Sequence, residues 1–542
     1  MESISSGELL NSSSEFEDSR AACRDTPQVK DAVLAKPQSV DGIPTDVRNP
    51  AADSLAPLSN AFIEEANALI EEVSSEQLVS NASSSREKQP QTSLPDHLSW
   101  AGAHRAVILL AWPVLLEQVL HFSVGFFDVY LSGRLGQEET AAIGMAAYVS
   151  WLGSMIFGLV GVGATALIAR FWGAHQFDEA RTIISRAMAL AICIGISVSC
   201  VLFTMAPGIV WLLGLSGESV QIGVTYLRID AIGQIFSAWV LVGAASLRGA
   251  GDMRTPLYVL CLTSVVNIVL STTFVYGLGP VPKLGVNGIV YGTVCAQFSG
   301  AMLMAWFLTS GRTVLQIVYK EFLIRRESTW RLMRIGGPAA LDGVATFTGH
   351  FLFLMIISRL TDGKAAFAAH IIGVRVEALS YLPAVAFGIA SGSLAGRYLG
   401  AQRPDLARAC GFAAVGQAVA YAALMSVLFF TFAPQIYANM HIDPLVQTIG
   451  VDPFRLMACY QIPNAILIVL VSTLRGSGDT RFPLWCAFLG TFFVRVPVAW
   501  SLGIGLNYGL FGAWIGMGAD NILRCCLISW RYLAGRWTHV KV

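Results

Sequence analysis

The sequence predicts an all-α membrane protein of twelve transmembrane helices, arranged as two parallel six-helix repeats around a central cleft. Three observations lead to this fold class: an apolar composition, apolar runs long enough to cross a bilayer, and a sequence that repeats itself. Of the 542 residues, 54% are hydrophobic and 13% are charged, and the mean hydropathy is +0.58. This composition excludes an ordinary soluble globular protein.

Twelve apolar segments, each of about 20 residues and so long enough to cross the hydrocarbon core as a helix, are separated by charged or Gly/Pro-rich breaks. They begin near residues 106, 141, 182, 222, 256, 286, 335, 365, 407, 449, 482 and 509. The loops on the side of the N-terminus contain 20 Lys and Arg residues, and those on the opposite side contain 4. Because cytoplasmic loops retain basic residues, we expect both termini in the cytoplasm, below a plasma or inner membrane.

The segment LRGAGDMRTP at 247–256 returns as LRGSGDTRFP at 474–483, at an offset of 227 residues. The same offset pairs Arg170 with Arg397. Since each copy holds six spans, the second copy enters the membrane in the same direction as the first. Two such lobes facing each other across a cleft are typical of transporters that work by alternating access.

The repeat and the charge distribution divide the chain into five parts. These are an acidic, disordered cytoplasmic tail (1–97), an N-lobe (98–310), an amphipathic linker helix at the cytoplasmic surface (311–334), a C-lobe (335–533) and a cytoplasmic C-terminus (534–542). The tail holds 17 acidic and 7 basic residues, which argues against nucleic-acid binding. Apolar residues at helical spacing between Asn60 and Val79 leave open a short amphipathic helix in the tail.

Motifs for catalysis are absent from the sequence. It has no Walker-type phosphate loop, no zinc-protease helix, no GxSxG elbow and no paired His/Asp metal cluster. Its ten cysteines show neither CxxC nor metal-ligand spacing. We therefore expect a monomer in the lipid bilayer that is not an enzyme, has no cofactor or metal, and draws energy from an ion gradient.

Acidic side chains within apolar spans are the first candidates for coupling to an ion, because a charge in the bilayer is costly unless it is paired or hydrated. The candidates are Glu117, Asp128, Asp230, Asp342, Glu377 and Asp520. Asp128 has apolar neighbours on both sides in the sequence. Glu117 and Asp342 are equivalent in the two repeats, which also fits a shared structural hydrogen bond. Asp520 is expected to pair locally with Arg524, one helical turn away.

Uncharged polar side chains within the spans add oxygen atoms that a cation site or a polar substrate cavity would use. They include Gln234, Asn267, Thr293 and Gln461. Hydrogen bonding between helices is an alternative of equal weight. Phe126 and Trp239 are aromatic candidates for the wall of a cleft that takes organic cations, although aromatic residues in spans mostly pack against other helices.

Each LRGxGDxRxP segment supplies an arginine and an aspartate at a helix end near the cytoplasm, with Gly for the turn and Pro at the start of the next helix. These charged residues are Arg248, Asp252, Arg475 and Asp479. We expect them to form a cytoplasmic gate or to brace the loops.

Several motifs between residues 106 and 533 together resemble the multidrug and toxic compound extrusion (MATE) family. They are PVLLEQ at 113–118, the aspartate of FFDVYLSGRLG, GVGATALIARFWGA, GIASGSLAGRYLGA, AAHIIGVRVEALSYLP and the two LRGxGDxRxP segments. The resemblance implies a twelve-helix antiporter that expels drugs or other small, mostly cationic organic compounds, driven by the inward flow of protons or sodium ions.

The resemblance also assigns an ion site to the N-lobe. Asp128 looks like the first-helix aspartate of the family's cation site, and Asn267 and Thr293 look like its fifth- and sixth-helix members. The acid expected one turn after that asparagine is Ser271 in this chain. A site with one clear carboxylate slightly favours protons, because sodium prefers several oxygen ligands.

The C-lobe sodium site of NorM-type members looks altered, since its acidic positions are Thr346 and Asn464. Asp342, Glu377 and Glu117 remain further candidates for coupling. For the substrate cleft, the predicted residues are Gln234, Gln461, Asn464, Phe126 and Trp239.

Two other functions stay open at this point. A flippase for a lipid-linked precursor would need several arginines in the cleft to hold a phosphate, and Arg375 and Arg495 are the evident candidates. A non-transporting membrane scaffold with a partner-binding tail would need neither duplicated halves nor buried carboxylates.

Overall fold

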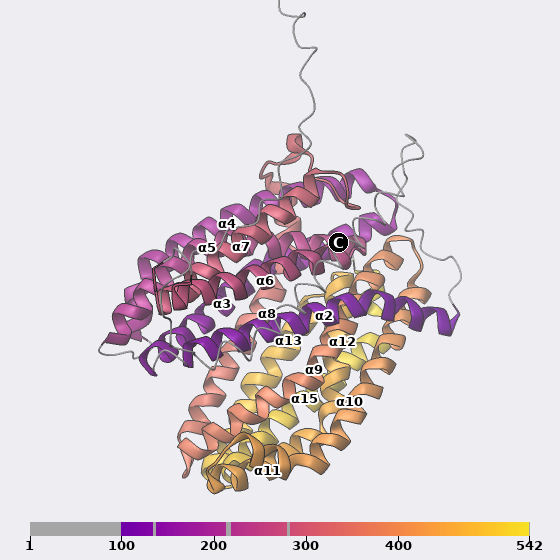
Figure 1. Ribbon diagram of the computed structural model, residues 1–542. Helices are drawn as coiled ribbons and strands as arrows, with labels where there is room; N and C mark the ends of the chain where they lie inside the picture. Colours follow the sequence, from indigo (N-terminus) through magenta and orange to yellow (C-terminus); the bar gives the residue numbers. More distant parts are fainter. Residues whose placement is uncertain (1–98, 134–136, 213–217, 279–281, 541–542) are drawn as a thin grey trace, which may run out of the picture. The chain divides into compact units, whose positions relative to one another are not determined.

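A computed structural model describes residues 99–133, 137–212, 218–278 and 282–540. The predicted acidic tail, including the amphipathic segment 60–79, lies outside the described residues. From residue 99 onward the described chain belongs to one compact unit. Within these residues the secondary structure is helical, with no strand (Figure 1).

The N-lobe helices are α2 (Trp100–Gly133), α3 (Gln137–Gly173), α4 (Phe177–Leu212), α5 (Glu218–Ala250), α6 (Arg254–Tyr276) and α7 (Val286–Thr309). The C-lobe helices are α8 (Arg326–Ser358), α9 (Gly363–Gly400), α10 (Pro404–Met440), α11 (Pro444–Cys459), α12 (Gln461–Ser477), α13 (Arg481–Phe488), α14 (Val496–Trp500) and α15 (Gly509–Leu533). Two π-helical segments, η2 (Leu489–Arg495) and η3 (Ser501–Gly505), make 481–505 one continuous stretch, and η1 (Tyr319–Glu321) and η4 (Arg536–His539) are short 3-10 helices.

Ten of the described helical stretches are long and apolar enough to cross a membrane, and the pair α11–α12, bent by 54°, is the eleventh. The twelfth is α15, which is more polar because it carries Asp520, Arg524 and Arg531. The predicted all-α membrane fold is confirmed, and the helices fall at the predicted spans.

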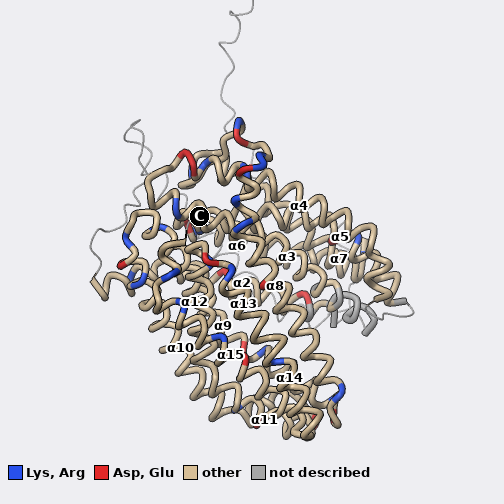
Figure 2. Tube along the Cα trace, turned by 180° about the vertical axis from the view of Figure 1, so that it is seen from behind, with Lys and Arg blue, Asp and Glu red and all other residues tan. Residues whose placement is uncertain are grey.

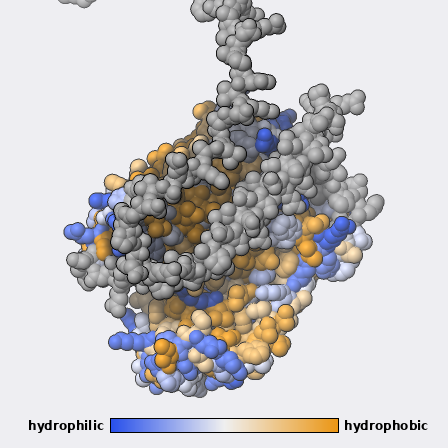
Figure 3. All heavy atoms as spheres, viewed as in Figure 1, coloured by the Kyte–Doolittle hydropathy of each residue, from blue (hydrophilic) through white to orange (hydrophobic). Residues whose placement is uncertain are grey.

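The surface of the unit fits a bilayer. Large apolar side chains are exposed along single helices, for example Val201, Phe203 and Met205 on α4. Charged residues gather mainly near the end that carries the C-terminus (Figure 2). On the face drawn in Figure 3, hydrophobic residues cover the visible middles of the helices and hydrophilic residues lie at their ends. An apolar exposed surface of this extent indicates contact with lipid.

The first helix of each repeat crosses to the other lobe. The first half of α2 contributes Ala103, Val107 and Ala111 to a core made otherwise of C-lobe residues, and Gln417 Nε2 on α10 donates to the His104 carbonyl at 3.0 Å. In the same way, the first half of α8 contributes Leu332 to the N-lobe core. The second half of each helix returns to its own lobe.

One set of close contacts between the lobes lies at one end of the helices. The C-terminal ends of α3 and α9 cross so closely that a Cβ added at Gly173 would overlap the Arg397 carbonyl, and one at Gly400 would overlap the Arg170 carbonyl. Only glycine permits this approach of two backbones. This end also carries the interlobe segment 310–325 and the C-terminal residues, and we call it the linker end.

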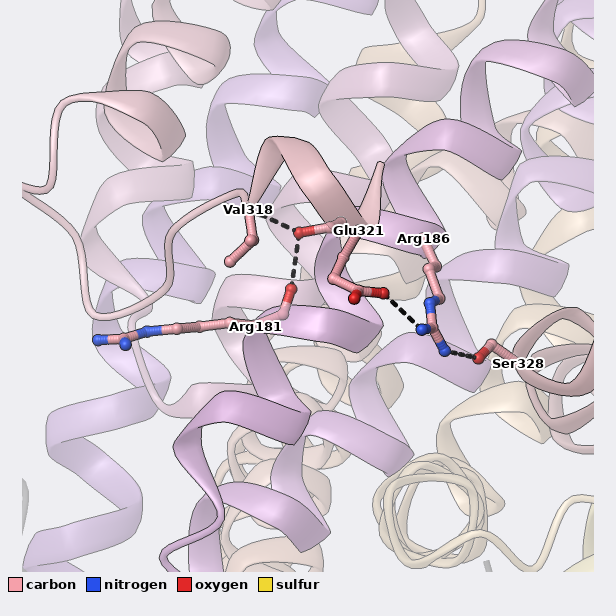
Figure 4. Close-up of polar contacts among 6 residues, drawn as sticks. Arg181, Arg186, Val318, Glu321 and Ser328 are labelled. Carbon is pink, nitrogen blue, oxygen red and sulfur yellow. Dashed lines mark hydrogen bonds and ion pairs between the residues drawn. The ribbon is translucent and has the colours of Figure 1, made fainter. Parts of the chain in front are cut away.

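The interlobe segment departs from the predicted amphipathic helix over 311–334. It is irregular apart from the short η1, and α8 begins at Arg326, so the basic residues 326–334 form the first turns of a spanning helix instead. Side chains of α4 hold the segment in place (Figure 4). Arg186 binds Glu321 and Ser328, each at 2.5 Å, and Ser185 Oγ accepts from the Val318 amide at 2.9 Å. These contacts from α4 fix the segment at Val318 and Glu321.

One difference between the lobes lies in the fourth helix of each repeat. In the N-lobe, α5 runs unbroken, whereas the corresponding part of the C-lobe bends between α11 and α12 at Tyr460. Pro463 lies just after the bend and has no amide hydrogen to donate to the carbonyl four residues earlier. The residue 227 positions before it is Phe236, which continues the helix.

Candidate functional site

A polar cluster inside the N-lobe joins α3 to α5. Ser150 Oγ donates to Asp230 at 2.7 Å, and Gln234 Nε2 donates to the same carboxylate oxygen at 2.9 Å. Asp230 and Gln234 are both buried. Two neutral donors, and no arginine or lysine, therefore satisfy this buried acid among the described residues.

Asp128, on α2, lies near this cluster. Its Oδ1 atom is buried without a hydrogen-bond partner among the described residues, and both Asp128 and Asp230 interact electrostatically with the buried Tyr226. No described basic side chain forms an ion pair with Asp128 or acts on it electrostatically. A buried acceptor without a donor is the group that a bound proton or cation would satisfy.

Asn267 and Thr293 come together as predicted. Asn267 Nδ2 on α6 donates to Thr293 Oγ1 on α7 at 3.0 Å, while Asn267 Oδ1 remains buried without a described partner. Ser271 Oγ donates to the Ile289 carbonyl at 3.3 Å, so the position where the family pattern has an acid joins the same two helices. Since α2 packs against α6 and α6 against α7, the N-lobe offers unpartnered acceptor oxygens on neighbouring helices.

The C-lobe contains a corresponding cluster around Glu377 on α9. Gln461 Nε2 and Asn464 Nδ2, both on α12, approach Glu377 Oε1 at 3.4 Å, and Ser380 Oγ donates to Gln461 Oε1 at 2.8 Å. Glu377 is buried, whereas Arg375 is exposed. These two residues, two positions apart on α9, therefore point in different directions.

The offset of 227 residues places these clusters at equivalent sites. Glu377 corresponds to Ser150, Gln461 to Gln234, and Asp230 to Met457. Each lobe thus buries one carboxylate beside one glutamine, but the acid is on the fourth helix of the N-lobe and on the second helix of the C-lobe.

Asp520 pairs differently from the prediction. Its carboxylate lies 2.7 Å from Arg495, which η2 supplies, and 3.8 Å from Arg524 on its own helix. The main partner therefore comes from the π-helical segment η2 and not from α15 itself. The residue that corresponds to Asp520 in the N-lobe is Thr293. Arg495 also acts electrostatically on Glu377.

Glu117 and Asp342 support the structural alternative. Glu117 is paired with Arg248, and Asp342 with Arg475. The two ion pairs are equivalent in the repeats and join the first helix of each lobe to its LRG segment. The predicted gate arginines therefore bind two of the predicted coupling acids.

The two aspartates of the gate segments make unlike contacts. Asp252 Oδ1 accepts from the Arg254 and Thr255 amides at 3.1 and 3.0 Å, at the start of α6. Asp479 Oδ2 instead accepts from Arg531 Nε on α15 at 2.9 Å. Both aspartates brace their own lobe, which is the loop-bracing role that the sequence left open.

The remaining predicted cleft residues are dispersed. Phe126 is 60% exposed, whereas Trp239 packs in the N-lobe core and contacts Phe322 of the interlobe segment, with ring centroids 6.2 Å apart. Trp239 therefore does not join Gln234, although both are on α5. A cavity of about 810 Å³ beside Asp362, Asp452 and Tyr508 is lined by none of the predicted site residues.

Sequence reasoning missed the pairing of Ser150 with Asp230 and the role of Arg495. Subtracting the repeat offset of 227 from Glu377 gives Ser150, so the repeat could have identified this residue. The partner of Arg495 could not be predicted, because no sequence signal marks the π-helical segment that contains it. In the described part of the chain, no group of three or more His, Cys, Asp or Glu residues is placed to hold a metal ion.

Comparisons with known proteins identify the family. The MatE family model matches residues 113–273 and again 338–501, which are the two repeats. A probable multidrug resistance protein NorM of Thermotoga maritima is 29% identical over 450 residues, covering 80% of this chain and 93% of the relative. The uncharacterized transporter YisQ of Bacillus subtilis is 24% identical over 438 residues, covering 79% and 94%.

Solved structures show the same fold. A crystal structure of MATE in complex with MaL6 has a TM-score of 0.74 at 22% identity and covers 80% of this chain and 97% of that one. An outward-facing conformation of a multidrug resistance MATE family transporter gives the same TM-score, identity and coverage. With both repeats matched, this chain belongs to the MATE family, whose members are multi-pass membrane transporters of small molecules and not enzymes.

Proposed function

We propose that this transporter exports small organic compounds, mostly cationic ones, in exchange for protons or sodium ions. The names of its relatives, probable multidrug resistance proteins NorM, support drug extrusion. The observation that carries the coupling is a pair of N-lobe carboxylates, the half-buried Asp128 and the buried Asp230, which have no basic partner among the described residues. Burial without a compensating base disfavours a charged carboxylate, and uptake of a proton or a cation would relieve this cost.

Asp128 is the primary coupling residue in this proposal, and Asp230, Asn267 and Thr293 supply further oxygen atoms around it. Sodium would use several of these oxygens as ligands, whereas a proton needs one carboxylate. Glu377 is a secondary candidate, because Arg495 partly compensates its charge. Glu117 and Asp342, each paired with an arginine, hold the lobes in shape.

Alternating access is the transport cycle we propose. The C-terminal ends of α3 and α9 cross in close contact at the linker end, and the charge bias of the loops supports placing this end in the cytoplasm. In this assignment the structure represents the state closed to the cytoplasm. Substrate would bind between the lobes, near Gln234, Gln461, Asn464 and Phe126.

The test is ethidium efflux from proteoliposomes under an imposed proton gradient and, separately, an imposed sodium gradient. We expect one gradient to drive efflux by the wild type, and Asp128→Asn to abolish it. Asp342→Asn serves as the matched control, since its acid is already paired with Arg475. Gradient-driven efflux at the wild-type rate in Asp128→Asn would refute the assigned coupling site.

The flippase alternative finds less support in the side chains. Arg495 is paired with Asp520, and Arg375 is exposed, so the two arginines do not form a common phosphate site. The scaffold alternative leaves the buried acids of the N-lobe without a role.

A further inference from the structure

Arg170 reaches from the N-lobe to a helix end in the C-lobe. It lies near the C-terminal end of α3, and its Nη2 atom donates to the carbonyls of Ser477 and Val540, at 3.1 Å each. Ser477 is the last residue of α12. The guanidinium of one lobe thus binds the carbonyl end of a helix in the other lobe.

Arg397 makes the reciprocal approach. It is the repeat equivalent of Arg170 and lies near the C-terminal end of α9. Its guanidinium lies against Gly251, the residue that follows the end of α5, so closely that a Cβ at this glycine would overlap Nη1. Gly251 has a φ of +91°, a backbone conformation that favours glycine. Helices α5 and α12 are themselves equivalent in the two repeats.

Elementary electrostatics favours these contacts. The last carbonyls of a helix lack intrahelical partners and carry the negative end of the helix dipole. Arginine keeps its charge when buried and donates several hydrogen bonds in one plane. Ser393 Oγ adds a neutral contact across the lobes, because it donates to the Arg248 carbonyl at 2.6 Å. A rigid rotation of one lobe away from the other would break all of these contacts together.

We propose that Arg170 and Arg397 are positioning residues that clasp the lobes shut at the linker end, each by binding the C-terminal helix end of the opposite lobe. Opening this end during transport requires both guanidiniums to leave α5 and α12. This inference rests on the alternating access of the proposed function. It assigns the gate to these two arginines rather than to Arg248 and Arg475, which pair within their own lobes.

The test measures the distance between the lobes directly. Spin labels attached to non-canonical amino acids at Gln176 and Asp405, which are exposed on the two lobes at the linker end, leave the native cysteines in place. Double electron–electron resonance in nanodiscs then compares the wild type with Arg170→Gln and Arg397→Gln. Arg181→Gln is the matched control, because Arg181 lies at the same end and pairs only with Asp178 among the described ion pairs.

We expect a single short distance in the wild type and in the control. Each glutamine variant should show a second, longer distance whose population rises about tenfold, as the loss of a charge-assisted hydrogen bond implies. Arg170→Lys, which keeps the charge, should lie between the two. Wild-type distance distributions in both glutamine variants would overturn the clasp.

Two further outcomes are distinguishable. The size-exclusion elution profile shows whether Arg397→Gln folds. If it does not, two other variants take over the test: Arg170→Gln, at a less buried arginine, and Ser393→Ala, at an uncharged contact. If the wild type shows no gradient-driven efflux but the glutamine variants lengthen the distance, the clasp stands as a conformational device and the proposed antiport fails. Unchanged distances with normal efflux reject the clasp alone.

Discussion

The two lobes share one scaffold but compensate their buried acids differently. Asp230 in the N-lobe is bound by a serine and a glutamine. Glu377 in the C-lobe is approached by two amides and lies within the electrostatic reach of Arg495. Among the described residues, each lobe thus buries an acid beside a glutamine, and a basic side chain acts on that acid only in the C-lobe. This difference underlies our proposal that the cation binds in the N-lobe.

The second polar pair shows the same contrast. Asn267 and Thr293 make a neutral hydrogen bond between α6 and α7, whereas the equivalent helices of the C-lobe are joined by the ion pair of Arg495 and Asp520. The π-helical segment η2 belongs only to the C-lobe. Such segments often mark functional sites, and this one contains Arg495, the basic residue of the ion pair.

The largest effect is expected from breaking the C-lobe ion pair. Asp520→Ala leaves the buried Arg495 without its main partner, which costs about 3–5 kcal/mol, so the thermal unfolding temperature should fall steeply. The double variant Asp520→Leu/Arg495→Met, which removes both charges, should recover most of the stability. A double variant as unstable as the single one would show that the pair is not the source of the effect.

Exchanging the acid between helices sharpens the comparison. Asp230→Met alone should reduce gradient-driven ethidium efflux at least about tenfold, because the N-lobe loses one of the two acids that lack a described basic partner. Adding Ser150→Glu rebuilds the C-lobe arrangement in the N-lobe and should restore a substantial part of the rate. If efflux stays lost in the double variant, transport depends on which helix carries the acid, and not only on where the carboxylate lies.

The two equivalent ion pairs should differ in strength. Glu117→Gln leaves Arg248, whose side chain is 18% exposed, whereas Asp342→Asn leaves Arg475, which is 32% exposed and better hydrated. We expect destabilisation of about 1–3 kcal/mol in the first case and less in the second. Thermal unfolding in detergent measures both, and equal losses would contradict the argument from hydration.

The smallest effect concerns the interlobe segment and depends on pH. The hydrogen bond from Arg186 lowers the pKa of Glu321 below its ordinary value of 4.5. A carboxyl group with a lowered pKa stabilises the fold above that ordinary value and loses this contribution as the pH falls through the lowered pKa. Glu321→Gln should therefore lower the unfolding temperature slightly at pH 7, and the difference should vanish in acid. Glu327→Gln, at an exposed glutamate, is the control. An equal fall in its unfolding temperature would show that the effect does not come from the hydrogen bond between Arg186 and Glu321.

Much of the fold was predictable because apolar length and repetition are explicit in the sequence. Twelve spans and two repeats follow from these patterns, whereas the meeting of Asn267 with Thr293 was implied by the resemblance to the MATE family. The interlobe helix was wrongly predicted, since basic residues with interspersed apolar ones describe an interfacial helix and the start of a spanning helix equally well. Side-chain partners were least predictable. Helices that are apolar all round give no periodicity that reveals which face meets which neighbour, so neither the Arg495 pairing nor the core position of Trp239 could be read from the sequence.

The central claim is that the coupling ion binds in the N-lobe. Its most direct test is the release of that ion when substrate is added to purified protein, recorded with a pH-indicator dye for protons and with radioactive sodium for sodium ions. The account predicts that release is lost in Asp128→Asn, reduced in Asp230→Asn and retained in Glu377→Gln. Release that persists in both N-lobe variants and disappears in Glu377→Gln would contradict it and move the coupling site to the C-lobe.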